Sequence, residues 1–233
     1  YEWMLRDNPR RRFWKWQQAS NWAQGVEGNL DSSHASFLHK FFDLSHPWNF
    51  GNTGANINRR PLLSDDGAPV LTAKETDFGF VYGARREAEG GKYYWRLTPF
   101  MLPSFTLVPG PSWPRGGHCY VPVDDEHNMV FQYSASDQPM TEQQVVRANA
   151  SPENLTWQHH ELKDGTIIDC WRPQRQKGND YLIDRVAQKE KRAYSGVFGF
   201  SAQDYSLQES MGPIQNHEAE QLLPTDKAIV MAR

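Results

Sequence analysis

A chain of 233 residues with 38% hydrophobic and 13% aromatic residues is long enough to bury a sizeable core, so we expect a globular protein. Its 25 Lys and Arg against 28 Asp and Glu give a net charge of −3, which excludes a strongly basic protein for nucleic acid or membrane surfaces. Cys119 and Cys170 form no paired motif, so we expect a reducing, cytoplasmic location. No apolar run has transmembrane length, and no membrane partner is expected.

The first predicted element is a helix from Asn21 to about Phe42, followed by a loop rich in Gly, Asn and Pro. Six runs rich in Val, Tyr, Phe and Thr then predict an antiparallel meander: PVLTA, DFGFVYGARR, KYYWRLTPFML, SFTLVPG, GGHCYVPVD and NMVFQYSAS. The Gly-Gly in EAEGGKYYW predicts a hairpin turn. Residues 137–180 are expected to be mixed helix and irregular structure, and a helix is expected from Ser201, broken at Pro213 and Pro224. This order favours an α+β fold.

One stripe of the first predicted helix is wholly polar. A solvated face is the commoner meaning of such a stripe. However, no Lys or Arg lies between Lys15 and Lys40, although exposed helix faces normally carry them. An acidic stripe without lysine favours a buried cation. Its members fall within an arc of about 140° on a helical wheel: Asn21, Gln24, Glu27, Asp31 and His34.

Two histidines near the end of this helix are candidate metal ligands. His34 and His39 are about 140° apart on an ideal helix, so they share a metal only if the helix kinks or widens. A lone H-x4-H pair is weak evidence, because it often occurs by chance. Asp31 strengthens it, since its carboxylate lies about 60° from His34 and could bond the second imidazole nitrogen or bind the metal itself.

The segment NWAQGVEGNLDSSHASFLH closely resembles the iron-site helix of Rieske non-haem iron oxygenase alpha subunits, particularly the phthalate dioxygenase and phenoxybenzoate dioxygenase group. The signature of that family is D-x-x-H-x4-H. Further segments agree in order, namely GGHCYVPVDDE, NDYLIDR and QDYSLQESMGPI, so the resemblance covers essentially the whole chain. It implies an α+β helix-grip fold, START-like, in which an antiparallel sheet is packed with helices. Residues 1–233 would then be the catalytic, mononuclear-iron domain.

The resemblance implies that His34, His39 and Asp204 hold Fe(II), leaving coordination positions open for dioxygen. It implies that Asp31 links the iron site to the Rieske cluster of a neighbouring subunit, and that Glu27 is a polar residue near the iron. These two are the candidate catalytic residues beside the ligands.

Asp204 has a competing interpretation. SAQD is also a capping-box pattern, in which Ser201 caps the helix and Asp204 at the third helical position reaches back. Composition alone does not choose Asp204 over Asp180, Asp184 or Glu209. The family pattern, with an acid followed five residues later by Glu209 in DYSLQE, does choose it.

The Rieske domain that the resemblance implies, with its [2Fe-2S] cluster, should precede Tyr1 and is absent from this chain, which we expect to be truncated at both ends. The expected reaction is mono- or dioxygenation of an aromatic ring by O2, with NAD(P)H electrons delivered through a separate reductase or ferredoxin. The expected assembly is a homo-oligomer, a trimer or a multiple of it. An aromatic carboxylate is the expected substrate, and Arg59 and Arg60 in the long loop could bind it bidentately, although solvated loop arginines are commoner.

Two other functions fit parts of the sequence. A helix-grip domain can be a non-catalytic carrier of apolar ligands, although a carrier has no need of the histidines and acids in matching order. A zinc hydrolase could use the same ligands with a metal-bound water. The identity of the metal separates the three: iron favours the oxygenase, zinc the hydrolase, and no metal the carrier.

Overall fold

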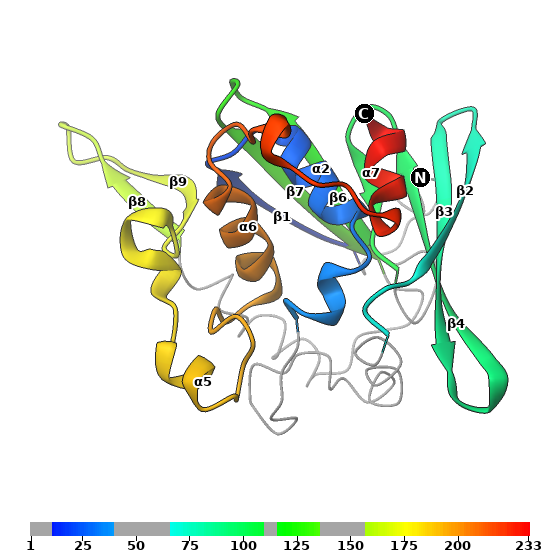
Figure 1. Ribbon diagram of the computed structural model, residues 1–233. Helices are drawn as coiled ribbons and strands as arrows, with labels where there is room; N and C mark the ends of the chain where they lie inside the picture. The colour runs from blue at the N-terminus through cyan, green and yellow to red at the C-terminus, as the bar shows by residue number, and fades with distance from the viewer. Residues whose placement is uncertain (1–10, 40–65, 110–115, 136–156) are drawn as a thin grey trace.

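The computed structural model of the protein describes residues 11–39, 66–109, 116–135 and 157–233. Its main feature is a seven-stranded antiparallel sheet with helices in front of it (Figure 1). The strands are β1 (Arg11–Gln18), β2 (Val70–Thr76), β3 (Gly79–Ala88), β4 (Lys92–Met101), β5 (Phe105–Leu107), β6 (Gly116–Pro122), β7 (Asn128–Ala135), β8 (Trp157–Glu161) and β9 (Ile167–Pro173). The helices are α2 (Trp22–Leu30), α5 (Arg185–Lys189), α6 (Phe200–Ser210) and α7 (Lys227–Ala232), with 3-10 turns η1 (His34–Ser36), η4 (Glu89–Gly91), η6 (Lys177–Leu182), η7 (His217–Ala219) and η8 (Pro224–Asp226).

The strand order of the sheet is β1-β7-β6-β5-β4-β3-β2, so β2 to β7 form the predicted meander. All six strands predicted from the sequence are present, and the expected α+β class, an antiparallel sheet packed with helices, is confirmed. The Gly-Gly hairpin turn is confirmed as well. Gly90 and Gly91 have φ of 69° and 68°, a conformation that glycine adopts without strain, and they bring Ala88 opposite Lys92.

Two sets of strands were not predicted. β1 pairs with β7 at one edge of the sheet, with Trp16 opposite Val130. The expectation of mixed helix and irregular structure for 137–180 is wrong in its described part, because β8 and β9 form a hairpin. β9 packs against β1, and the Lys15 ammonium lies 4.3 Å from the centre of the Trp171 ring. β1 pairs with β7 and contacts β9, both far away in the sequence, which local patterns do not reveal.

The first helix is shorter than predicted. α2 ends at Leu30, because Asp31 is extended with φ −71° and ψ 112°. A single 3-10 turn, η1, then carries His34. The prediction of a helix to Phe42 is therefore wrong after Leu30, and residues 40–42 lie outside the described residues. The Asp31 side chain accepts hydrogen bonds from backbone N–H groups that follow it, which stabilises a turn in place of a continued helix.

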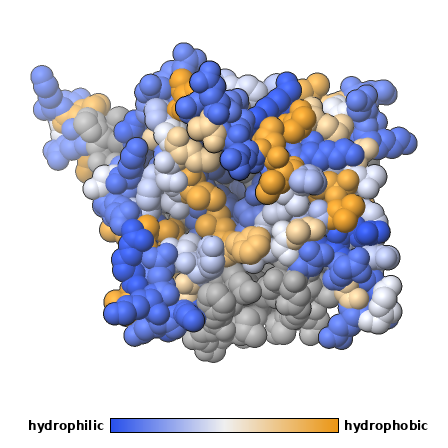
Figure 2. All heavy atoms as spheres, in the orientation of Figure 1, coloured by the Kyte–Doolittle hydropathy of each residue, from blue (hydrophilic) through white to orange (hydrophobic). Residues whose placement is uncertain are grey.

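The core lies between the sheet and the helices, and α2 packs against β5, β6, α6 and α7. Gly25 permits this close packing, because a Cβ there would lie 2.3 Å from the Tyr120 ring. On the face seen in Figure 2, hydrophilic residues cover most of the surface and hydrophobic ones gather around α7. Among the described residues, no helix is both long and apolar enough to cross a bilayer.

Candidate metal centre

The turn that carries His34 is built by Asp31. Its Oδ1 accepts a hydrogen bond from the Ser33 N–H at 2.7 Å, and its Oδ2 accepts one from the His34 N–H at 3.1 Å. An acid in this position caps the N–H groups of the turn that follows, as it does at a helix N-terminus. The distortion that the H-x4-H spacing requires is thus present, since both histidines lie beyond the end of α2.

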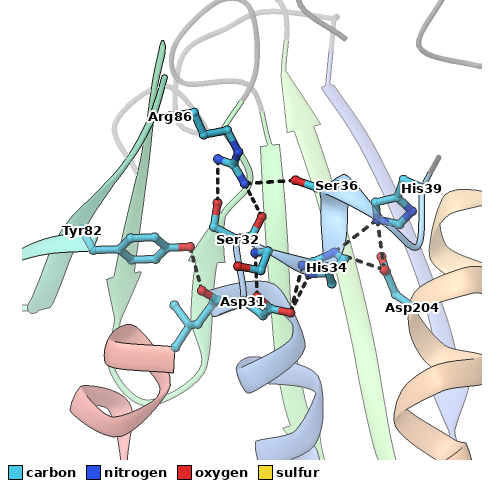
Figure 3. A network of polar contacts seen from close by, with 10 residues as sticks. Asp31, Ser32, His34, Ser36, His39, Tyr82, Arg86 and Asp204 are labelled. Carbon is cyan, nitrogen blue, oxygen red and sulfur yellow. Dashed lines mark hydrogen bonds and ion pairs between the residues drawn. The ribbon is translucent and has the colours of Figure 1, made fainter. Parts of the chain in front are cut away.

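His34, His39 and Asp204 converge on one point between η1 and α6 (Figure 3). The Nε2 atoms of the two histidines are 3.2 Å apart. Asp204 Oδ1 lies 3.2 Å from Nε2 of His39 and 3.6 Å from Nε2 of His34. Three ligand atoms bound to one metal at about 2.1 Å, at right angles, would lie about 3 Å apart. The cluster therefore has the spacing and donor atoms of a two-histidine, one-carboxylate metal site. It is the one such group of three among the described residues.

Electrostatics in this cluster favour an ionised carboxylate. Burial opposes the charge of Asp204, but His39 and His34 outweigh it and hold the pKa of Asp204 below its usual value. Burial likewise disfavours the imidazolium of His34, yet Asp31 and Asp204 outweigh it and raise the pKa of His34. Without a cation, the two acids therefore favour a proton on this imidazole. A divalent cation would compensate the two carboxylates and replace that proton.

Asp31 contacts the imidazole of His34 on the side away from the cluster. Its Oδ2 lies 3.5 Å from Nδ1 of His34, longer than an ordinary hydrogen bond, so the contact is mainly electrostatic. A carboxylate on this side favours a proton on Nδ1, which leaves the lone pair of Nε2 for a metal. The sequence left two roles open for Asp31: contact with the second nitrogen of His34, or direct binding of the metal. The geometry favours the contact with His34.

Asp204 does not cap its helix. α6 begins at Phe200 after Gly199, whose φ of 107° suits glycine, and Gly199 makes no side-chain cap. Asp204 is therefore at the fifth helical position, two residues beyond the third position that a capping box requires. The capping-box interpretation is wrong, and the carboxylate of Asp204 points at the histidines (Figure 3).

Gln203 is a buried residue of the site that the sequence did not reveal. Its Nε2 donates to the Val197 carbonyl at 2.9 Å, which directs its Oε1 toward His39. Nδ1 of His39 lies 2.7 Å from this Oε1 and donates its proton there. This tautomer leaves the Nε2 lone pair facing Asp204 and His34. The available signal was its place in the chain, directly before the carboxylate ligand.

The substitution Gln203→Leu is expected to weaken metal binding by about tenfold to a hundredfold, because Nδ1 of His39 loses its acceptor. Titration of the chelator-stripped, full-length protein with Co²⁺, followed by calorimetry, measures this. Gln208→Leu is the matched control, because Gln208 is buried on the same helix but contacts Gln18. Unchanged affinity in Gln203→Leu would show that His39 needs no fixed tautomer.

Of the remaining predicted residues, Glu27 has its hydrogen-bond partner at the C-terminus of the chain. Glu27 accepts hydrogen bonds from Arg233 at 2.8 and 3.0 Å, so its place near the iron stays a prediction that these contacts do not support. Gln24, on the same polar stripe, donates to the carbonyls of Gln208 and Gly212, both at 3.0 Å. Protein contacts thus account for the polarity along α2. Arg59 and Arg60 lie outside the described residues.

His118, which the sequence left without a role, is buried on β6. Burial lowers its pKa to about 4, and nearby Asp204 opposes this only in part. Its Nδ1 lies 2.8 Å from Nδ2 of Asn29, which donates to it. His118 is therefore neutral at physiological pH and joins α2 to the sheet.

A family model described as LigXa C-terminal domain like matches residues 2–233. The oxygenase subunit of 3-chlorobenzoate-3,4-dioxygenase from Comamonas testosteroni is 35% identical over 225 residues, which cover 93% of this chain and 50% of that protein. The oxygenase subunit of phthalate 4,5-dioxygenase from Pseudomonas putida is 32% identical over 218 residues, covering 91% and 47%. The chain thus spans about half the length of the curated relatives it matches.

A solved structure, the terminal oxygenase of carbazole 1,9a-dioxygenase from Novosphingobium sp. KA1, is 17% identical and covers 94% of this chain and 54% of that one. The TM-score is 0.49, a likeness too loose to support any further conclusion.

Proposed function

Because the chain belongs to the LigXa C-terminal domain like family, we propose that it is the catalytic domain of a Rieske-type aromatic ring-hydroxylating oxygenase. The observation that carries this proposal is the convergence of His34, His39 and Asp204, two imidazole nitrogens and one carboxylate oxygen, at mutual distances that suit a metal ion. In the proposed enzyme these residues hold a mononuclear Fe(II). When bound, the iron would supply the activation of dioxygen.

The two alternative functions are less well supported. A carrier of apolar ligands gains nothing from a partly buried cluster of two histidines and a carboxylate, whose removal from water is unfavourable without a bound cation. A zinc hydrolase would use the same three ligands, and distances near 3 Å suit zinc as well as iron. The names of both relatives, which are dioxygenase oxygenase subunits, favour iron over zinc.

We propose an aromatic carboxylate as the substrate class. The relatives are named for 3-chlorobenzoate and for phthalate, which are both aromatic acids. An arginine is the side chain best suited to bind such a carboxylate, because its guanidinium can donate two parallel hydrogen bonds. Arg59 and Arg60 remain candidates from the sequence. Among the described residues we add Arg96 on β4, whose charge acts on His34 and which is therefore near the cluster.

We also propose an electron donor and a homo-oligomeric assembly. Electrons would come from NAD(P)H through a reductase or ferredoxin and a Rieske [2Fe-2S] cluster in another part of the full-length protein. Two electrons balance either outcome, a dihydrodiol that holds both oxygen atoms or a phenol plus water. The residues of this chain would hold the ring beside the metal and exclude bulk water. We propose a cytoplasmic homo-oligomer, a trimer or a multiple of it.

The proposed function is tested with the full-length protein, a reductase, NADH and ¹⁸O2. We expect benzoate, 3-chlorobenzoate or phthalate to yield a product that carries ¹⁸O, detected by mass spectrometry. Chelation should abolish the product, and added Fe(II), but not Zn²⁺, should restore it. A zinc-dependent product that takes its oxygen from water, and so carries no ¹⁸O from ¹⁸O2, would support the hydrolase. Tight binding of these acids by a protein that holds no metal would support the carrier.

A further inference from the structure

Arg86 on β3 is the largest fully buried side chain among the described residues, with 0% of its surface exposed. Within those residues, every hydrogen bond from its guanidinium goes to a neutral oxygen. Figure 3 shows those to Ser32 and Ser36. Burying a charge without a carboxylate partner is unfavourable, and an apolar side chain of similar size would usually be more stable there. The contacts of Arg86 therefore call for a role other than stability.

Those contacts lie on both sides of His34. Nη2 donates to the Ser32 carbonyl at 2.6 Å and Nη1 to the Ser32 hydroxyl at 3.2 Å. A longer contact of 3.5 Å joins Nη2 to the Ser36 hydroxyl. Ser32 precedes and Ser36 follows the metal-cluster histidine in the same turn, and both are buried. A planar guanidinium can hold both ends of this turn at once, which a single ammonium group cannot.

The same guanidinium also bonds to Asp66, a residue shortly before β2. Its Nε donates to the Asp66 carbonyl at 2.9 Å. Asp66 in turn accepts from the N–H groups of Ala68 and Glu87, both at 3.0 Å, so it is attached to β3. Arg86 thus joins the turn of His34 to Asp66, which lies shortly before β2.

This support matters because the turn itself is weak. η1 is a single 3-10 turn, whose hydrogen bonds have poorer geometry than those of an α-helix. Metal ligands must keep their positions within a few tenths of an ångström. Asp31 stabilises the turn by accepting hydrogen bonds from its N–H groups, and Arg86 stabilises it by a hydrogen bond from the sheet.

We propose that Arg86 is a positioning residue of the metal centre: it fixes the turn of His34 to the sheet and so determines the affinity for the metal. The proposal rests on the proposed metal-binding role of the cluster. The hydrogen bonds of Arg86 within the described residues go to Ser32, Ser36 and Asp66, and none goes to a ligand side chain of the cluster.

The test compares Arg86→Lys with Arg85→Lys, its neighbour on the opposite face of β3. Arg85 is partly exposed, pairs with Glu87 and lies over the Tyr93 ring, so it is a matched control. Chelator-stripped full-length protein is titrated with Co²⁺ by calorimetry, well below the melting temperature. We expect Arg86→Lys to bind Co²⁺ about tenfold to a hundredfold more weakly, and Arg85→Lys to bind it as the wild type does.

Hydrogen exchange separates positioning from general stability. The N–H groups of Phe37 and Leu38 bond to the His34 carbonyl, so their exchange should accelerate in Arg86→Lys, while that of β6 and β7 stays unchanged. A purely structural role would accelerate exchange throughout and leave the Co²⁺ affinity of the folded protein as it was. That result would overturn the proposal.

Two further outcomes are decisive. If Arg86→Lys does not fold, Ser32→Ala replaces it, with an expected loss of about fivefold for one hydrogen bond, and unchanged affinity would overturn the proposal. If the wild type and His34→Ala bind Co²⁺ equally, or neither binds it, the metal-binding role itself fails. Failure of the proposed function is thereby distinguished from failure of this inference.

Discussion

Alanine in place of His39 or His34 is expected to remove one iron per chain from the full-length protein and to abolish ring hydroxylation. Each substitution leaves two protein ligands, which are too few to hold Fe(II) against buffer and water. The cluster offers no replacement, because within the described residues no fourth donor belongs to it. Elemental analysis of iron per chain measures the loss, and circular dichroism shows whether the protein is folded.

His127→Ala is the matched control for these variants. His127 is a half-buried histidine that pairs with Asp124 at 3.0 Å in the turn between β6 and β7, away from the cluster. Its replacement should leave the iron content unchanged. Unchanged iron in both His34→Ala and His39→Ala would remove the cluster from consideration as the metal site.

The part of the fold that the sequence predicts best is the meander. β2 to β7 have runs of β-branched and aromatic residues between Gly, Pro and Asp turns, and each pairs with its neighbour in sequence. β1 was missed because its partner, β7, is more than a hundred residues later in the chain. The end of α2 was predictable in principle, since Asp31, Ser32 and Ser33 are residues whose side chains compete for backbone N–H groups.

Some residues of the candidate site were predictable from the sequence, and others were not. The D-x-x-H-x4-H motif identifies His34 and His39 locally, but Asp204 was chosen only through the family resemblance, and the structure supports that choice by its position beside both histidines. Gln203 and Arg86 act through contacts between distant segments, such as Arg86 with Ser32. No local pattern separates such a residue from an ordinary buried polar one.

Replacing an aspartate by asparagine should have different effects on the iron content at Asp204 and at Asp31. In Asp204→Asn the cluster loses its negative ligand, and an amide is a poor substitute for a carboxylate beside two histidines. We expect this variant to lose the iron of the catalytic site. Asp31→Asn should largely retain it, because Asp31 contacts His34 on the side away from the cluster. Iron per chain, measured in both variants, is the readout.

Asp31→Asn should nevertheless reduce turnover by orders of magnitude. The amide keeps the size of the side chain but loses the charge, and its NH2 group cannot accept from the His34 N–H as the carboxylate does. It would also no longer favour a proton on Nδ1 of His34, nor compensate a cationic group on a neighbouring subunit, the link that we propose between the iron site and the Rieske cluster. The expected phenotype is therefore a reducible Rieske cluster, a nearly normal iron content and slow electron transfer from the Rieske cluster to the iron site. If instead Asp31→Asn loses iron and Asp204→Asn keeps it, Asp31 is the ligand and the assignment proposed for Asp204 is wrong.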